Sequence, residues 1–300
     1  TQLVKDVFLG EQSASITEMV ATAEKVYFNA SDGVKGLELW VTDGTHENTK
    51  LVEDLNRTGA SSYPGHIRAF KDQLIFSANA DVDRYGFELY SSEGTANTSQ
   101  LIKDINPGKA SASARLEVIL GEYFYFIPSH SEYGREIWKS DGTAEGTQIL
   151  IDIGDGDRSS SAERLVQLKD RFVFSAFTPE YGEELWVSHG TADSTYLLKD
   201  INPSYHQSFP TFHYRTPTLN DSVALFVAHQ ESIGRALWKT DGTEEGTQLV
   251  KDIRPYDNST RSPISSITAI DSIAYFSGDD GRGRELWRTD GTTVEQLDNT

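Results

Sequence analysis

Carboxylates recur along this 300-residue chain at fixed places, and their type and spacing could do chemistry. Glutamate precedes the aromatic end of a repeated "ELW" phrase at Glu38, Glu88, Glu136, Glu184 and Glu285, and Ala236 breaks the series. Arginine stands directly before this position at Arg135, Arg235 and Arg284. Such groups can form ion pairs between packed units, or they can bind the hydroxyl groups of a sugar. We treat Arg135, Arg235, Arg284, Glu136, Glu184 and Glu285 as candidate ligand-binding residues beside their structural interpretation.

A second series of acids follows each phrase in "TDGT" or "SDGT", at Asp43, Asp141, Asp241 and Asp290. Aspartate followed by glycine favours a tight turn, because both residues tolerate a positive φ. Glu93 and His189 replace the aspartate in two copies, which a turn tolerates and a metal site would not. We therefore predict that these aspartates build turns. Further acids in "KDI" are expected to cap the loops that follow them, or to form a charged rim.

Signals for a metal or for catalysis are weak. The pairs Asp81 and Asp83, and Asp155 and Asp157, could bind calcium, which takes several oxygen ligands. Solvated loops are the favoured explanation, because such pairs arise easily in an acidic chain. No cofactor is required by the sequence, so calcium is left open. The chain contains no cysteine and none of the GxSxG, HExxH, P-loop or EF-hand patterns. We therefore name no catalytic residue.

Three tyrosines occupy one equivalent place, each directly before a glycine: Tyr85, Tyr133 and Tyr181. An exposed ring beside a glutamate or arginine could stack on a sugar. The same ring could instead pack on a neighbouring unit as a turn residue. Loops after "KDI" vary most, and function in repeat scaffolds usually lies in such loops.

The repeat itself defines the elements that must hold these side chains. Its aromatic anchor recurs at intervals of about 50 residues, at Trp40, Tyr90, Trp138, Trp186, Trp238 and Trp287. Each unit contains four short runs with strand periodicity, and no stretch has helical periodicity with caps. We expect the anchors to pack between neighbouring units.

Four antiparallel strands repeated six times predict an all-β fold, a six-bladed β-propeller formed by residues 1–300 as a single domain. The segment "TQLVKDV" at residues 1–7 matches "TQLVKDI" at 247–253. We therefore expect residues 1–7 to complete the last blade, built by residues 261–292, so that no open edge remains. The competing possibility is that "TVEQL" near the C-terminus supplies this strand.

Composition limits the partners. A net charge of -19 argues against nucleic acid, because phosphate binding needs clustered Lys and Arg. No apolar run is long enough for a membrane-spanning helix, so membrane insertion is not expected. Five N-x-S/T sequons permit secretion without requiring it.

The phrases "ELWVTDGT", "EIWKSDGTAEGTQILIDI" and "ALWKTDGTEEGTQLVKDI" resemble the ELWxTDGTxxGT repeat family, often labelled hyalin-like or uncharacterised. The resemblance covers essentially the whole chain. It implies a propeller and a secreted, extracellular setting. It transfers no activity and no catalytic residues, and the second and fourth units depart most from the pattern.

The main functional prediction is a non-enzymatic, multivalent lectin-like module that binds glycans in clefts between blades. One alternative is a carbohydrate-active hydrolase or lactonase-like propeller enzyme that uses channel carboxylates and calcium. Another is a structural or adhesion propeller with a protein partner.

Overall fold

The computed structural model describes the chain apart from residues 82, 157, 204–206, 213–217, 256–261 and 298–300. The described residues are all-β and contain no α-helix, only the 3-10 turn η1 (Ala192–Ser194). The chain divides into two compact units, Thr1–Ile149 and Leu150–Thr300. The prediction of one domain over residues 1–300 stays a prediction. No described helix has the length and apolar character needed to span a bilayer.

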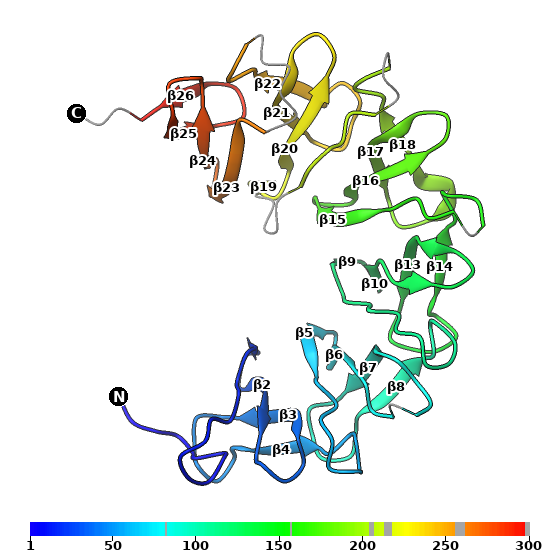
Figure 1. Cartoon of the computed structure of the whole chain (residues 1–300), viewed down its shortest axis with the longest axis vertical. Coiled ribbons are helices and arrows are strands. Elements are labelled where there is room, and N and C mark those ends of the chain that lie inside the picture. Colours follow the sequence, from blue (N-terminus) through cyan, green and yellow to red (C-terminus); the bar gives the residue numbers. More distant parts are fainter. Residues whose placement is uncertain (82, 157, 204–206, 213–217, 256–261, 298–300) are drawn as a thin grey trace. The chain divides into compact units, whose positions relative to one another are not determined.

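The first unit carries three four-stranded antiparallel sheets, and the strands follow chain order across each sheet (Figure 1). Sheet one is β1 (Met19–Ala21), β2 (Val26–Ser31), β3 (Leu37–Thr42) and β4 (Lys50–Glu53). Sheet two is β5 (Gly65–Phe70), β6 (Gln73–Ala78), β7 (Glu88–Ser92) and β8 (Gln100–Lys103). Sheet three is β9 (Val118–Leu120), β10 (Tyr123–Phe126), β13 (Ile137–Ser140) and β14 (Gln148–Ile151), which spans the division between the units. The two-stranded pair β11 (Ser129–His130) and β12 (Gly134–Arg135) extends it.

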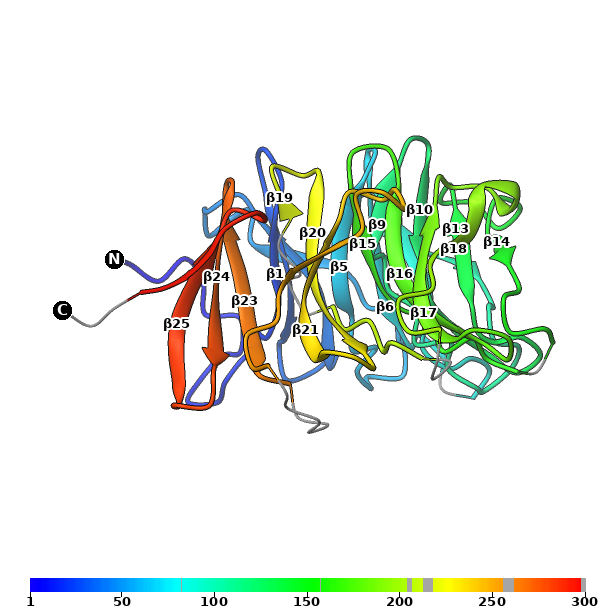
Figure 2. The ribbon, with the colours of Figure 1, turned by 90° about the horizontal axis from the view of Figure 1, so that it is seen from above.

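The second unit repeats the same order in three further sheets (Figure 2). Sheet four is β15 (Glu163–Gln167), β16 (Phe172–Thr178), β17 (Gly182–Ser188) and β18 (Thr195–Lys199). Sheet five is β19 (Thr218–Leu219), β20 (Val223–Gln230), β21 (Gly234–Thr240) and β22 (Gln248–Lys251). Sheet six is β23 (Ile264–Ile270), β24 (Ile273–Asp279), β25 (Arg284–Thr289) and β26 (Val294–Gln296). The four-strand repeat expected from the sequence is confirmed.

Leucine and the aromatic residue of each "ELW" phrase pack on opposite faces of a sheet, because successive side chains of a strand alternate. In the first unit Leu39 of sheet one packs with Tyr90 of sheet two, and Leu89 of sheet two packs with Trp138 of sheet three. In the second unit the pairs are Leu185 with Trp238 and Leu237 with Trp287. In these sheets the phrase therefore contributes one buried apolar side chain to each neighbouring contact.

The outer edge of sheet six differs from the favoured prediction. β26 pairs antiparallel with β25, with Val294 opposite Thr289, so the "TVEQL" segment supplies the fourth strand. Residues 1–7, which were expected there, form no strand, and that prediction is wrong. A short turn joins β25 to β26, so this pairing closes only a small loop.

Residues near the N-terminus instead lie against sheet one. Lys5 Nζ donates to the carbonyl oxygen of Thr49 at 2.6 Å. Lys103 of β8 donates to the corresponding carbonyl of Thr147 in sheet three, also at 2.6 Å. Val7 packs on the cluster of Phe28 and Trp40. Lys5 therefore contacts sheet one in the same way that Lys103, in the outer strand of sheet two, contacts sheet three.

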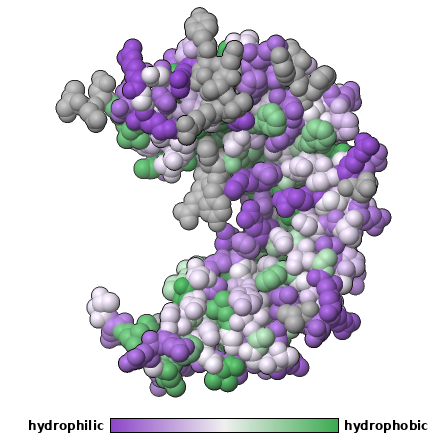
Figure 3. Space-filling model, in the orientation of Figure 1, coloured by the Kyte–Doolittle hydropathy of each residue, from purple (hydrophilic) through white to green (hydrophobic). Residues whose placement is uncertain are grey.

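The visible surface is mostly hydrophilic or of intermediate hydropathy (Figure 3). Sheet six exposes the apolar side chains Ile270 and Leu286. Leu286 is 51% exposed, whereas Leu237 at the same place in sheet five is fully buried. The second unit therefore leaves one face of its last sheet uncovered.

Candidate functional site

Recurring glutamates accept hydrogen bonds from the loops that lead from one sheet to the next. The Glu38 carboxylate accepts backbone N–H bonds from Leu55 at 3.1 Å and from Ser62 at 2.8 Å, and it accepts the Ser62 hydroxyl. Glu88 accepts from the backbone N–H groups of Ile105 and Ala112. Glu184 accepts the Ile201 N–H at 3.0 Å and the Ser208 hydroxyl at 2.6 Å. These contacts differ from the ion pairs that the arginines suggested.

Glu38, Glu88, Glu136 and Glu184 are fully buried, whereas Glu285 in sheet six is exposed. Burial raises the pKa of Glu38, Glu88 and Glu184 to about 7, although the hydrogen bonds act in the opposite direction. A buried carboxylate with such contacts is closed to an external ligand unless its loop moves. These residues therefore act as loop clamps in the described structure.

The "DGT" aspartates close the turns between the third and fourth strands. Asp141 Oδ1 accepts the N–H of Thr143 at 2.9 Å and its hydroxyl at 2.7 Å, and Asp43 and Asp241 repeat this pattern. Asp290 Oδ1 accepts two backbone N–H groups at 2.7 Å. A Cβ at Gly146 would collide with the Asp141 carboxylate, so the second glycine of the motif is needed for this close approach.

The remaining aromatic positions have structural contacts. Trp40, Tyr90, Trp138, Trp238 and Trp287 are buried, and Trp186 is partly buried. Tyr133 packs against the core of the first unit and its ring lies 4.9 Å from that of His130. The Arg84 guanidinium lies 4.9 Å from the Tyr85 ring centre. A hydrogen bond to Glu180 raises the pKa of Tyr181. All three candidate tyrosines are partly exposed.

The candidate arginines do not share one environment. Arg284 donates to the Ser265 hydroxyl at 2.9 Å and to the Ser262 carbonyl at 3.2 Å. Arg235 lies 6.0 Å from the Phe209 ring centre, and burial lowers its pKa while Glu183 acts in the opposite direction. Arg135 is exposed in β12. Binding by these residues stays a prediction.

The candidate calcium ligands lie in exposed loops. Asp81 Oδ1 accepts the N–H of Asp83 at 3.1 Å, and Asp83 lies 3.6 Å from the Lys109 ammonium. Asp155 donates its N–H to Asp152, and Asp157 lies outside the described residues. Within the described ranges no three acidic or histidine side chains are grouped as a metal site would require. Calcium binding remains an untested prediction.

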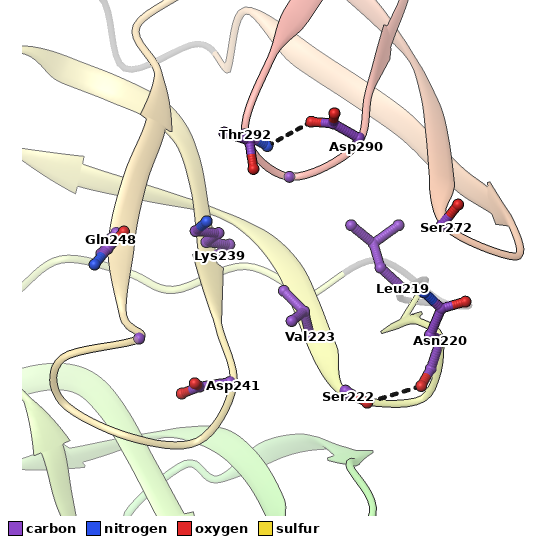
Figure 4. Close-up of a pocket in the computed structure, with 12 residues that line it drawn as sticks. Leu219, Asn220, Ser222, Val223, Lys239, Asp241, Gln248, Ser272, Asp290 and Thr292 are labelled. Carbon is purple, nitrogen blue, oxygen red and sulfur yellow. Dashed lines mark hydrogen bonds between the residues drawn. The ribbon is translucent and has the colours of Figure 1, made fainter.

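A cavity of about 420 Å³ opens between sheets five and six, within the second unit (Figure 4). Its walls come from the β19–β20 hairpin with Leu219 and Asn220, and from the sheet-six turn with Asp290 and Thr292. Lys239 and Gln248 lie on one side of the gap, and Leu219 and Ser272 lie on the other (Figure 4). A volume within the range of about 300–1,000 Å³ suits a small ligand. This site was not predicted from the sequence. Its sequence signal is Val223, which stands where sheets two, three and four carry a longer side chain.

The chain matches no protein-family model and, among curated proteins, it has no match. It is similar to a solved puromycin-hydrolyzing peptidase of Mycobacterium tuberculosis, with 12% identity and a TM-score of 0.52, over 96% of this chain and 44% of that one. It is also similar to a structure from a study of two prolyl endopeptidases, with 9% identity and a TM-score of 0.54, over 95% of this chain and 43% of that one. The β-propeller domain of the Trilobed protease from Pyrococcus furiosus matches with 12% identity and a TM-score of 0.47, over 96% of this chain and 86% of that one.

These comparisons correct the sequence-based conclusions in two respects. The proposed ELWxTDGTxxGT family finds no support, since no family model matches. The prediction of a non-enzymatic, lectin-like module is contradicted, because the proteins that share the fold across this chain are named as peptidases. The alternative of a hydrolase agrees with them better. The chain spans less than half the length of those two peptidase structures.

Proposed function

We propose that this chain is the β-sheet part of a peptide hydrolase, and that it binds peptide substrates. The observation that carries the proposal is the fold shared with two peptidase structures over 95–96% of the chain. Because the chain corresponds to 43–44% of those proteins, we assign it a substrate-binding part of the reaction.

The described histidine contacts support assigning substrate binding, and not bond cleavage, to these residues. His130 Nδ1 accepts the N–H groups of Glu132 and Tyr133, and His229 Nδ1 lies 3.4 Å from the Asn202 amide. Across the described ranges no histidine ring is hydrogen-bonded to a serine hydroxyl or a carboxylate, as an activated serine nucleophile would require. Bond cleavage is therefore assigned to groups outside the described residues.

Peptide binding without hydrolysis is the expected result for the chain on its own. Binding is measured by fluorescence anisotropy with a library of labelled short peptides, and cleavage by internally quenched versions of the same peptides. We expect micromolar to millimolar affinities and no increase in fluorescence from the quenched set. Cleavage by the pure chain would assign catalytic groups to it, and the absence of any peptide binding would overturn the proposal.

We also infer that the six four-stranded sheets are the blades of one propeller. The same strand order recurs in all six, and the leucine-to-aromatic packing recurs within each unit. Calorimetry is expected to show a single unfolding transition with equal calorimetric and van't Hoff enthalpies. Two resolved transitions, one for each compact unit, would contradict a single cooperative propeller.

A further inference from the structure

The cavity between sheets five and six is lined by Val223, a short side chain where sheets two and four carry glutamine and arginine. The second strand of each sheet pairs with the third, and one residue directly precedes the first paired residue. This residue is Gln73 in sheet two, Arg171 in sheet four and Val223 in sheet five. Each of these residues faces the "DGT" turn of the following sheet. The sequence difference at Val223 thus falls at a contact between sheets.

In sheets two and four the residue at this place reaches the turn of the following sheet. Arg171 Nη1 donates to the Gly242 carbonyl oxygen at 3.2 Å, so its side chain covers the turn of sheet five. Gln73 Oε1 reaches to 3.5 Å from the position that a Cβ would take at Gly142. Near Gly291 in sheet six only the Leu219 methyl and the Lys239 chain approach within 4 Å of the corresponding position. At Gly291 the close contact is therefore made by Leu219, and Val223 itself does not come within 4 Å of this position.

Lys239 is the charged group that this space exposes to a ligand. Its counterpart in sheet three, Lys139, places its ammonium 4.8 Å from the ring centre of Tyr123, the residue that corresponds to Val223. Sheet five has no ring at that place. Within the described part of the chain the Lys239 ammonium makes no hydrogen bond or ion pair, and it lines the cavity.

The two acids of the lining are already engaged by their own turns. Asp241 Oδ1 accepts the N–H and hydroxyl of Thr243, and Asp290 Oδ1 accepts two backbone N–H groups. The Asp241 carboxylate points away from Leu219 and Asn220 (Figure 4). Lys239 is thus the cationic group of the lining. The Asn220 amide can hydrogen-bond neutral polar groups, and Gln248, whose Nε2 donates to the Glu245 carbonyl oxygen at 2.7 Å, offers its Oε1 as an acceptor.

We propose that this cavity binds the C-terminal carboxylate of a short peptide, with Lys239 as its counter-ion. The Asn220 amide and Gln248 Oε1 can hydrogen-bond the peptide amides, and Leu219 and Val223 offer an apolar wall to an aliphatic side chain. The ligand class rests on the proposed peptide-binding function. The observation specific to this site is a lysine that lacks the aromatic contact which Lys139 makes with Tyr123 in sheet three.

The test compares two fluorescein-labelled tripeptides, Ala-Ala-Leu as the free acid and as the C-terminal amide, by anisotropy on the full chain. Lys239→Met is expected to weaken binding of the free acid about tenfold, the effect of losing one ion pair. The amide should bind the unchanged protein about tenfold more weakly than the acid does. Val223→Gln, which introduces the side chain found in sheet two, should block the cavity and reduce binding similarly.

Lys139→Met is the matched control, because Lys139 occupies the same strand position in sheet three and faces Tyr123. It should leave binding unchanged. Equal binding of acid and amide, or unchanged binding by Lys239→Met, would overturn this site while peptide binding itself stands. If neither tripeptide and no member of the peptide library binds, the site and the proposed function both fail. Circular dichroism melts confirm that each variant is folded.

Discussion

Replacing Glu38 by alanine is expected to lower the free energy of unfolding by about 3 kcal/mol. The substitution removes the acceptor for the backbone N–H groups of Leu55 and Ser62 and for the Ser62 hydroxyl, all in the loop that leads to sheet two. Ser62 and Glu38 are fully buried, so water does not readily replace the lost acceptor. Urea unfolding followed by tryptophan fluorescence measures the change.

Glu285→Ala provides the matched control. Glu285 occupies the same place in the repeat but is exposed in sheet six, so its replacement should change stability by less than about 0.5 kcal/mol. A Glu38→Ala variant as stable as Glu285→Ala would show that the loop does not depend on the carboxylate. Glu38→Gln should lie between the two, because its amide retains one acceptor oxygen.

The chain is expected to lose stability as the pH rises from about 5 to about 8. Burial raises the pKa of Glu38, Glu88 and Glu184 from 4.5 to about 7 in the folded state. Between these two values the folded chain binds more protons than the unfolded chain, so the free energy of unfolding falls with pH. The contribution is fully present below about pH 4.5 and is lost as the pH passes through about 7. Each carboxyl contributes of the order of 2 kcal/mol.

Glu184→Gln isolates this effect. Both described hydrogen bonds of Glu184 reach Oε2, and Oε1 is buried without a partner in the described structure. An amide can therefore keep the two bonds and remove the titrating proton. We expect a shallower pH dependence in urea unfolding at pH 5, 6, 7 and 8.

A Glu184→Gln slope equal to that of the unchanged chain would contradict the pKa shift. Burial lowers the pKa of His66, His130 and His229, and these groups favour the folded state as the pH rises. The difference between variant and parent cancels their contribution. The turn aspartates Asp43 and Asp290 have lowered pKa values through their hydrogen bonds and titrate below this range.

The repeat was predictable because its strands and turns depend on residues that are close together in the chain. Alternating apolar residues and Asp-Gly turns specify four strands in each unit without reference to distant residues, and the structure contains six such sheets. The turn role of Asp141 was predicted for the same reason, because its partner Thr143 is two residues away. The outer strand of sheet six was not predicted correctly. Residues 1–7 and the "TVEQL" segment were both candidates for this edge, and only the pairing of β26 with β25 in the folded chain distinguishes them.

The sequence by itself determined the all-β class, the four-strand repeat and the turns, because each depends on residues close together in the chain. Only the tertiary structure decided what the recurring acids and lysines contact. Glu38 accepts a hydrogen bond from Ser62, which lies 24 residues further along the chain. Because Glu38 is buried, it fixes this loop, whereas an exposed carboxylate could bind a ligand. Lys239 lines a cavity opposite the turn of sheet six, a juxtaposition that arises only when two sheets pack.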